Sequence, residues 1–194
     1  DKINENNTQY SQGGIAAVIS SDDSFHEHIE DTIKAGHGLC DPDIVDGVVE
    51  EGPLRINELL SMGVNFDREN GCLALTQEGG HSHRRILRAN GDTTGKEIER
   101  GLIEFVKKND NISIFEYTFT IDLLVTDGKC KGVIAWHSQK GTMLIWAKQT
   151  ILAAGGCGQL YRETTNPKVA KGDGVAIAYR AGAIIQDMEF IQFH

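Results

Sequence analysis

The sequence predicts an α/β fold whose sheet changes character along the chain, and three observations predict it. Helical periodicity of apolar residues dominates the stretch from residue 24 to about residue 109. From residue 112 the apolar residues recur at every second position or in short runs, which indicates successive antiparallel strands. These strands lead directly into a glycine-rich stretch, residues 150–174, which begins with a short apolar run. Helices before and after strands, with an antiparallel meander inserted, are typical of an α/β arrangement.

Composition and charge limit the class of protein. The chain has 194 residues, 40% of them hydrophobic and 24% charged, as expected for a soluble globular protein with a buried core. The formal net charge of −9 argues against nucleic acid or an anionic membrane as partner. No apolar run approaches the roughly 20 residues that span a bilayer. The cysteines lack CxxC spacing, so neither a metal cluster nor a disulfide scaffold is expected. They are Cys40, Cys72, Cys130 and Cys157.

The first half of the chain carries clear helix signals. Apolar residues at a spacing of four predict a helix over 24–38. Asp41 and Pro42 then provide an N-cap and a proline at the first helical position. The apolar stripe that follows is interrupted at Pro53, which predicts either two helices or one kinked helix. Three histidines in this part are expected to be solvated surface residues: His26, His28 and His37.

Turn and capping signals organise the rest. Asn70-Gly71 predicts a hairpin turn. The run 94–97, Thr-Gly-Lys-Glu, fits a capping box that opens a helix ending near residue 109. Turns at Asp127-Gly128 and Lys140-Gly141 separate the later strands. The strands are predicted at 112–115, 120–126, 130–137 and 142–147.

Two glycine clusters indicate contact with a large ligand. In residues 150–174, the apolar run 151–154 predicts a buried strand that meets Gly155 and Gly156, where the backbone can approach a cofactor closely. Asp173 stands at the mouth of a helix expected to begin at Gly174, and it suits a ligand with hydroxyl groups. A second pair, Gly13-Gly14, precedes small apolar residues. Ordinary turns would explain either cluster equally well in isolation.

The loop 77–86 concentrates charge around a glycine pair. It contains one carboxylate, two imidazoles and two guanidinium groups, which could bind a dicarboxylate or act as acids and bases. His81 and His83 would share one face of a strand, as a metal site requires, but no third ligand follows closely. A solvated charged loop is the remaining alternative.

In four segments the sequence resembles the flavoproteins of the succinate dehydrogenase and fumarate reductase family, and in the run 78–86 especially the aspartate oxidase branch. Together the segments span nearly the whole chain in the order found in that family. They are 7–18; 78–86 with 94–95; 153–156 with 161, 164–167 and 172–174; and 180–183 with 189–194.

The resemblance implies part of an FAD-binding Rossmann-like domain with an inserted antiparallel β meander. It implies FAD-dependent oxidation of L-aspartate to iminoaspartate, with oxygen or fumarate as electron acceptor, in NAD biosynthesis. Glu78 is expected to orient the substrate ammonium group and His194 to hold a carboxylate. No metal is expected, and quinolinate synthase is the implied partner. The implied cofactor contacts are Asn7, Thr8, Gln9, Tyr10, Ser11, Gln12, Gly13, Gly14, Thr118, Phe119, Ala154, Gly155 and Asp173.

The departures from the family pattern are equally informative. Residues 1–194 are expected to form a partial FAD-binding domain, without the first dinucleotide-binding strand and without the capping domain. We therefore expect the chain alone to bind FAD poorly and to be inactive, and we expect a cytoplasmic enzyme. Lys171 stands where a small or hydroxyl residue is usual, and it could crowd the loop or contact an anionic part of the cofactor. A fumarate reductase or succinate dehydrogenase subunit, or a non-catalytic module of the same fold, are the alternatives.

Overall fold

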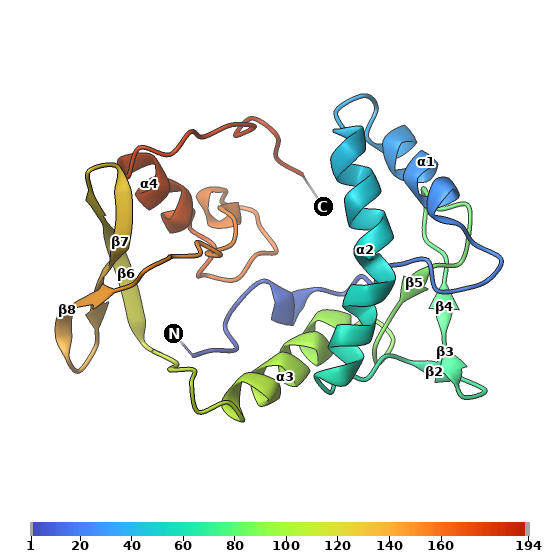
Figure 1. Cartoon of the computed structure of the whole chain (residues 1–194), viewed down its shortest axis with the longest axis horizontal. Helices are drawn as coiled ribbons and strands as arrows, with labels where there is room; N and C mark the ends of the chain where they lie inside the picture. The colour runs from blue at the N-terminus through green and yellow to red at the C-terminus, as the bar shows by residue number, and fades with distance from the viewer. Residues whose placement is uncertain (1, 193–194) are drawn as a thin grey trace. The chain divides into compact units, whose positions relative to one another are not determined.

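A computed structural model describes residues 2–192 of the chain, and these fall into two compact units. One unit comprises residues Thr8–Ile112, and the other joins the N-terminal residues up to Asn7 to the chain from Ser113 onward. The first unit holds most of the helices, and the second holds the longest strands (Figure 1).

Three helices form the frame of the unit 8–112: α1 (Phe25–Ala35), α2 (Pro42–Ser61) and α3 (Thr94–Lys107). The predicted N-cap of α2 is confirmed, and α1 is capped in the same way. The Ser24 side chain accepts a hydrogen bond from the Glu27 N–H, and Asp41 accepts from the N–H groups of residues 43 and 44. Pro53 lies inside α2, so the two predicted apolar stripes belong to one helix of 20 residues. Helices α1 and α2 lie side by side (Figure 1).

Helix α3 is present where predicted, but the predicted capping box is wrong. Thr93 is the N-cap residue and makes no side-chain cap bond. The hydroxyl of Thr94 instead accepts a hydrogen bond from the Ala89 N–H at 3.1 Å, and the Glu97 carboxylate accepts from the Asn65 N–H at 2.8 Å. Both side chains are buried. Tertiary partners therefore replace the local bonds, and they tie the first turn of α3 to the loops around it.

A small antiparallel sheet supports the loops of this unit. Its strands lie in the order β1 (Ile15–Ala16), β5 (Ile86–Leu87) and β4 (Leu75–Thr76). The predicted hairpin is confirmed: β2 (Arg68–Glu69) pairs with β3 (Cys72–Leu73), and Asn70 and Gly71 both have positive φ, as a tight hairpin turn requires. The core beneath the sheet comprises Ala17, Ile56, Val64, Phe66, Leu87 and Ala89.

The second unit is built on the predicted meander. Strands β6 (Thr118–Thr126), β7 (Lys129–His137) and β8 (Gly141–Trp146) form an antiparallel sheet, in which Thr118 pairs with His137 and Gly132 with Trp146. The predicted strand at 112–115 is wrong, because these residues have no regular secondary structure and pair with no strand among the described residues. Helix α4 (Asp173–Arg180) is tied to β6 by an ion pair of 2.9 Å between Arg180 Nε and Asp122 Oδ2.

The apolar run 151–154 differs from the prediction of a buried strand. It has no strand structure, and its four residues are exposed. Ile151 is 91% exposed. The physical reason is that a strand needs a hydrogen-bonding neighbour, and among the described residues no strand pairs with this run. A short 3-10 turn, η2 (Gly158–Leu160), follows it.

All four cysteines carry free thiols. Within residues 2–192, no helix is long and apolar enough to cross a membrane.

Candidate functional site

The residues predicted to bind cofactor and substrate are divided between the two units. The unit 8–112 contains the run 8–14 and Glu78, and the second unit contains six of the predicted cofactor residues. His194 lies outside the described residues. The six are Asn7, Thr118, Phe119, Ala154, Gly155 and Asp173.

The run 8–14 is laid against α3 and β5 by close backbone contacts. Its first three residues, Thr8, Gln9 and Tyr10, form the 3-10 turn η1 (Thr8–Tyr10). The Gly95 N–H donates to the Ser11 carbonyl oxygen at 3.1 Å, and a Cβ at Gly95 would lie 1.9 Å from the Thr8 carbonyl oxygen. A Cβ at Gly14 would lie 2.4 Å from the Leu87 carbonyl oxygen. Glycine is therefore required at both positions by packing within the unit.

The outer face of this run stays open. Tyr10 is 53% exposed, and Ser11, Gln12 and Gly13 are also exposed. A Cβ at Gly13 would meet nothing within 4 Å. The segment therefore presents hydroxyl, amide and backbone groups that a ligand could contact, while its inner face is fixed by the neighbouring elements.

Glu78 is paired with an arginine that the sequence analysis missed. Arg88 Nη2 donates to Glu78 Oε1 at 2.5 Å, and the side chains are 34% and 39% exposed respectively. A Cβ at Gly14 would lie 3.1 Å from Arg88 Cγ, so the stem of this arginine packs against the glycine run. The structure thus brings Glu78, the carboxylate predicted to bind the substrate, close to the predicted cofactor-binding run 8–14 within one unit.

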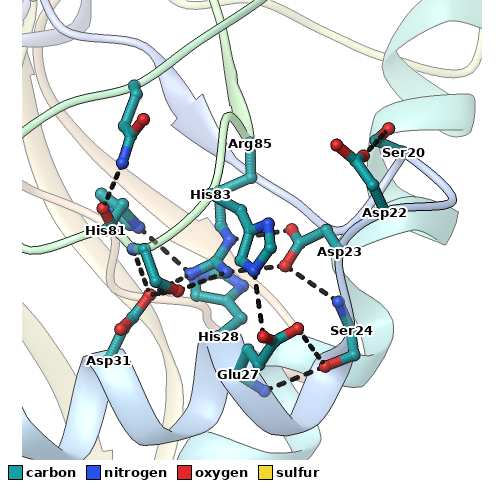
Figure 2. A network of polar contacts seen from close by, with 12 residues as sticks. Ser20, Asp22, Asp23, Ser24, Glu27, His28, Asp31, His81, His83 and Arg85 are labelled. Carbon is teal, nitrogen blue, oxygen red and sulfur yellow. Dashed lines mark hydrogen bonds and ion pairs between the residues drawn. The ribbon is translucent and has the colours of Figure 1, made fainter.

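The charged loop is held by a buried arginine (Figure 2). Arg85 donates to both oxygens of Asp23, from Nε at 2.8 Å and from Nη2 at 2.6 Å. Its Nη1 donates to Asp31 Oδ2 at 2.6 Å, and the Ser82 N–H donates to the same oxygen at 2.7 Å. The side chains of Arg85 and Asp23 are 0% and 1% exposed. A solvated loop was one alternative from the sequence, and this segment is instead anchored to α1 and to the residues before it.

Two histidines complete the network, and one corrects a prediction. His28, expected at the surface, is buried, and its ring lies 5.7 Å from the ring of His81. It faces inward because α1 turns that side of the helix toward the charged loop (Figure 2). His83 Nε2 lies 3.0 Å from Glu27 Oε1. The pairing of His81 with His83 as metal ligands therefore finds no support in the geometry, since each ring has a different neighbour.

The pKa shifts follow from these contacts. Burial raises the pKa of Asp31, but hydrogen bonds from Ser82 and Arg85 outweigh it and lower the pKa to about 2. The same competition, between burial and the bonds from Arg85 and Ser24, leaves the pKa of Asp23 below its usual value. Burial and the positive charge of Arg85 lower the pKa of His28.

One group of side chains has ligand atoms close enough for a metal ion. Atoms of Asp23, Glu27 and His83 lie within 4.8 Å of one another. Both oxygens of Asp23 already accept from Arg85, whose positive charge opposes a cation at that point. We therefore assign this group to the anchoring network.

The second unit contains a cavity of about 730 Å³, within the range of small-molecule sites. Two of the predicted cofactor residues, Phe119 and Asp173, line it. Exposed aromatic rings, positive charges and two carboxylates meet here. Such a lining fits a nucleotide, which offers a flat base, anionic phosphates and hydroxyl groups. The other lining residues are Lys2, Asn4, Glu5, Tyr117, Lys168, Val169 and Lys171.

The glycine-rich turn of this unit contains or contacts three more predicted cofactor residues, Asn7, Ala154 and Gly155. The side-chain amide of Asn7 lies 3.5 Å from the point that a Cβ on Gly155 would occupy. A Cβ at Gly174 would lie 2.7 Å from the Cβ of Ala154, so the start of α4 is pressed against the glycine-rich turn. Thr118 begins β6, next to Phe119. A second cavity of about 400 Å³ is lined by residues of the segments 158–166 and 191–192.

Lys171 lines the larger cavity and does not close it. Within the described residues, no ion pair engages its ammonium group or those of Lys2 and Lys168. Of the two roles considered for Lys171, contact with an anionic group is the one that this position favours.

The α/β fold and the lining of the larger cavity fit a nucleotide-binding domain. Residues 2–194 match the family model described as an FAD-binding domain, and the chain belongs to that family.

The chain is similar to L-aspartate oxidases. It is 53% identical to chloroplastic L-aspartate oxidase 2-b of Nicotiana tabacum, over 98% of this chain and 30% of that protein. It is 43% identical to L-aspartate oxidase of Streptomyces coelicolor, over 100% of this chain and 34% of that protein. The chain therefore spans about a third of the length of these relatives.

Solved structures show the same fold. The quinol fumarate reductase flavoprotein of Escherichia coli aligns with a TM-score of 0.87 and 32% identity, over 90% of this chain and 30% of that chain. Sdh1 of Mycobacterium smegmatis aligns with a TM-score of 0.87 and 29% identity, over 93% of this chain and 33% of that chain. The α/β prediction with an inserted antiparallel meander is confirmed.

Proposed function

We propose that this chain is part of an FAD-dependent oxidase that converts L-aspartate to iminoaspartate and passes the electrons to oxygen or fumarate. The observation that carries the proposal is the half-buried Glu78 carboxylate, held next to the run 8–14 in a chain 53% identical to an L-aspartate oxidase. Bound FAD would supply the hydride acceptor, and the protein would supply binding and orientation.

Different residues of this chain would bind the cofactor and the substrate. Asp173 would accept hydrogen bonds from cofactor hydroxyl groups, and Phe119 would offer an apolar face to a flat ring in the cavity of about 730 Å³. Thr8–Gly14 would contact the cofactor through their open face. Glu78 Oε2 receives no hydrogen bond from the described residues, so it can accept one from the substrate ammonium group. His194 would hold a substrate carboxylate, as the family resemblance implies.

A flavoprotein subunit of the fumarate reductase or succinate dehydrogenase type is the second candidate. The structural similarity supports this candidate, since both aligned chains give TM-scores of 0.87. The sequence identities, 53% against 32%, favour the aspartate oxidase.

The proposed place in metabolism is NAD biosynthesis, with quinolinate synthase as the enzyme that would take the product. We further propose that residues 1–194 are one part of the FAD-binding domain.

The experiment is aspartate-dependent hydrogen peroxide formation by the full-length protein loaded with FAD. We expect turnover with L-aspartate and none with succinate. Bound FAD without aspartate-dependent peroxide, together with succinate oxidation, would favour the second candidate. Bound FAD with neither activity would indicate a non-catalytic module.

A further inference from the structure

The pair formed by Glu78 and Arg88 is built asymmetrically. Arg88 donates through Nη2 to a single oxygen, Glu78 Oε1, at 2.5 Å. Among the described residues, the other carboxylate oxygen has no donor and the buried Arg88 Nε has no acceptor. Many arginine–carboxylate pairs use two parallel bonds, which would occupy both oxygens. Here each partner keeps one polar group unpaired, the Oε2 of Glu78 and the buried Nε of Arg88.

The backbone fixes both partners next to the glycine run. Glu78 follows β4 and Arg88 follows β5, and these two strands pair in the same sheet. The Arg88 carbonyl oxygen accepts a hydrogen bond from the Asp67 N–H at 2.8 Å, and its Cγ packs at Gly14. The guanidinium group is therefore held beside Glu78 by its own backbone and stem as well as by the ion pair.

We propose that Arg88 determines substrate specificity by allowing the Glu78 site to accept a dicarboxylate that lacks an amine as well as an amino dicarboxylate. The inference rests on the proposed function, in which one site oxidises L-aspartate and also reduces fumarate. An ammonium group pairs with the free oxygen of Glu78. A dicarboxylate without that group would meet a bare carboxylate and be repelled, and the positive charge of Arg88 cancels that repulsion.

The test uses the full-length enzyme loaded with FAD and compares Arg88→Met with the wild type. Methionine keeps the Cγ that packs at Gly14 and removes the charge. Fumarate and L-aspartate are each titrated, and binding is read from the change in flavin absorbance, with L-aspartate titrated anaerobically. We expect Arg88→Met to raise the fumarate Kd about 10-fold, since the pair is partly exposed and water screens the remainder. The aspartate Kd should change less than about 3-fold, because the ammonium group neutralises Glu78.

Three further variants separate this role from a structural one. Glu78→Gln should weaken L-aspartate binding and leave fumarate binding nearly unchanged. The double variant Glu78→Gln/Arg88→Met should recover fumarate binding, because no negative charge is left to cancel. Arg88→Lys should keep fumarate binding within about 3-fold of the wild type, because it keeps the charge. Arg55→Met is the matched control, since it breaks an exposed arginine–glutamate pair of 2.8 Å on α2.

Equal losses for both ligands in Arg88→Met, or a double variant as weak toward fumarate as Arg88→Met, would overturn the inference. The proposed function fails separately, if the wild type shows no aspartate-dependent flavin reduction. The fumarate titration still tests Arg88 in that case, because it measures binding without turnover.

Discussion

Two segments carry much of the proposed site, and they are held in different ways. In the charged loop, residues 77–86, side chains make the connections: Arg85 is fully buried between Asp23 and Asp31, and Ser82 donates to Asp31. In the glycine-rich segment, residues 150–174, backbone contacts dominate, such as the hydrogen bond of 3.2 Å from the Gly172 N–H to the Gly156 carbonyl oxygen. Charged side chains hold the first segment in place, whereas close backbone contacts at glycines hold the second.

The comparison shows which segment has its charged or apolar side chains covered by other residues of the described chain. The charged loop satisfies its buried charges with neighbours from its own unit. The glycine-rich segment leaves large apolar side chains open, among them Ile151 at 91% and Leu160 at 69% exposure. Large exposed apolar groups mark surfaces that a ligand or another part of a protein covers. We therefore expect the charged loop to depend on its ion pairs and the glycine-rich segment to depend on what binds it.

The largest effect is expected from Arg85→Met in the full-length protein. It leaves two carboxylates without their partner, one of them 1% exposed, and breaking a buried ion pair costs about 3–5 kcal/mol. Native-state hydrogen exchange of the loop amides measures this as a fall in the local opening free energy. Arg55→Met is the control, and we expect it to change that value by less than about 0.5 kcal/mol. Unchanged exchange in the loop would show that the network does not anchor it.

The glycine-rich segment is tested by Asp173→Asn. This variant keeps the size of the side chain and removes the charge that would strengthen hydrogen bonds from cofactor hydroxyl groups. Loss of one charge-assisted bond corresponds to about 1.5–3 kcal/mol, or a 10- to 150-fold rise in the Kd for FAD. Quenching of flavin fluorescence measures it in the full-length protein. Asp187→Asn, on an exposed turn of the same unit, serves as the control. An unaltered Kd in Asp173→Asn would remove this residue from the cofactor site.

Acid should weaken the charged loop in two separate pH windows. The folded protein holds His28 neutral below its ordinary pKa of 6.5, whereas the unfolded chain takes up a proton there, so stability falls as the pH drops below 6.5. Asp31 stays ionised down to about pH 2 while its unfolded counterpart protonates near 3.8, so a second loss lies between these values.

Hydrogen exchange of the loop amides as a function of pH measures both steps. His28→Asn should abolish the upper step and leave the lower one in place. An upper step that persists in His28→Asn would assign it to another group.

The smallest effect is expected from Ile151→Ser in the 194-residue chain. A side chain that is 91% exposed loses almost no buried area, so the free energy of unfolding should change by less than about 0.5 kcal/mol. The same substitution in the full-length protein should cost about 1–3 kcal/mol if another part of that protein covers Ile151. Urea unfolding of both proteins makes the comparison, and equal costs would show that the segment has no covering partner.

Sequence signals predicted helix starts and turns well where the interactions involve only residues close together in the chain. Asp41 caps its helix, and Asn70-Gly71 turns its hairpin, because a cap or a tight turn needs only neighbours in the chain. The strand expected at 151–154 failed because burial of a strand depends on a partner from elsewhere.

Sequence reasoning selected Glu78 from the family resemblance but missed Arg88. The pair stands ten positions apart, across two short strands, and no helical or strand spacing links such positions. A signal existed: a third arginine directly after the apolar pair Ile86-Leu87, in a segment already rich in charge. His28 was misplaced for a related reason, since the amphipathic pattern of α1 does not reveal that a charged loop covers that side of the helix.

The sequence by itself determined the class of fold, the Asp41 cap, the tight turns and the family, because each depends on residues close together or on motifs kept in order. Only the tertiary structure decided that Thr94 and Glu97 bond to other segments, that Arg85 is buried between two carboxylates, and that Glu78 faces Arg88. These are contacts between charged or polar groups distant in sequence. Their energies depend on burial and geometry, and both are set only when the elements pack.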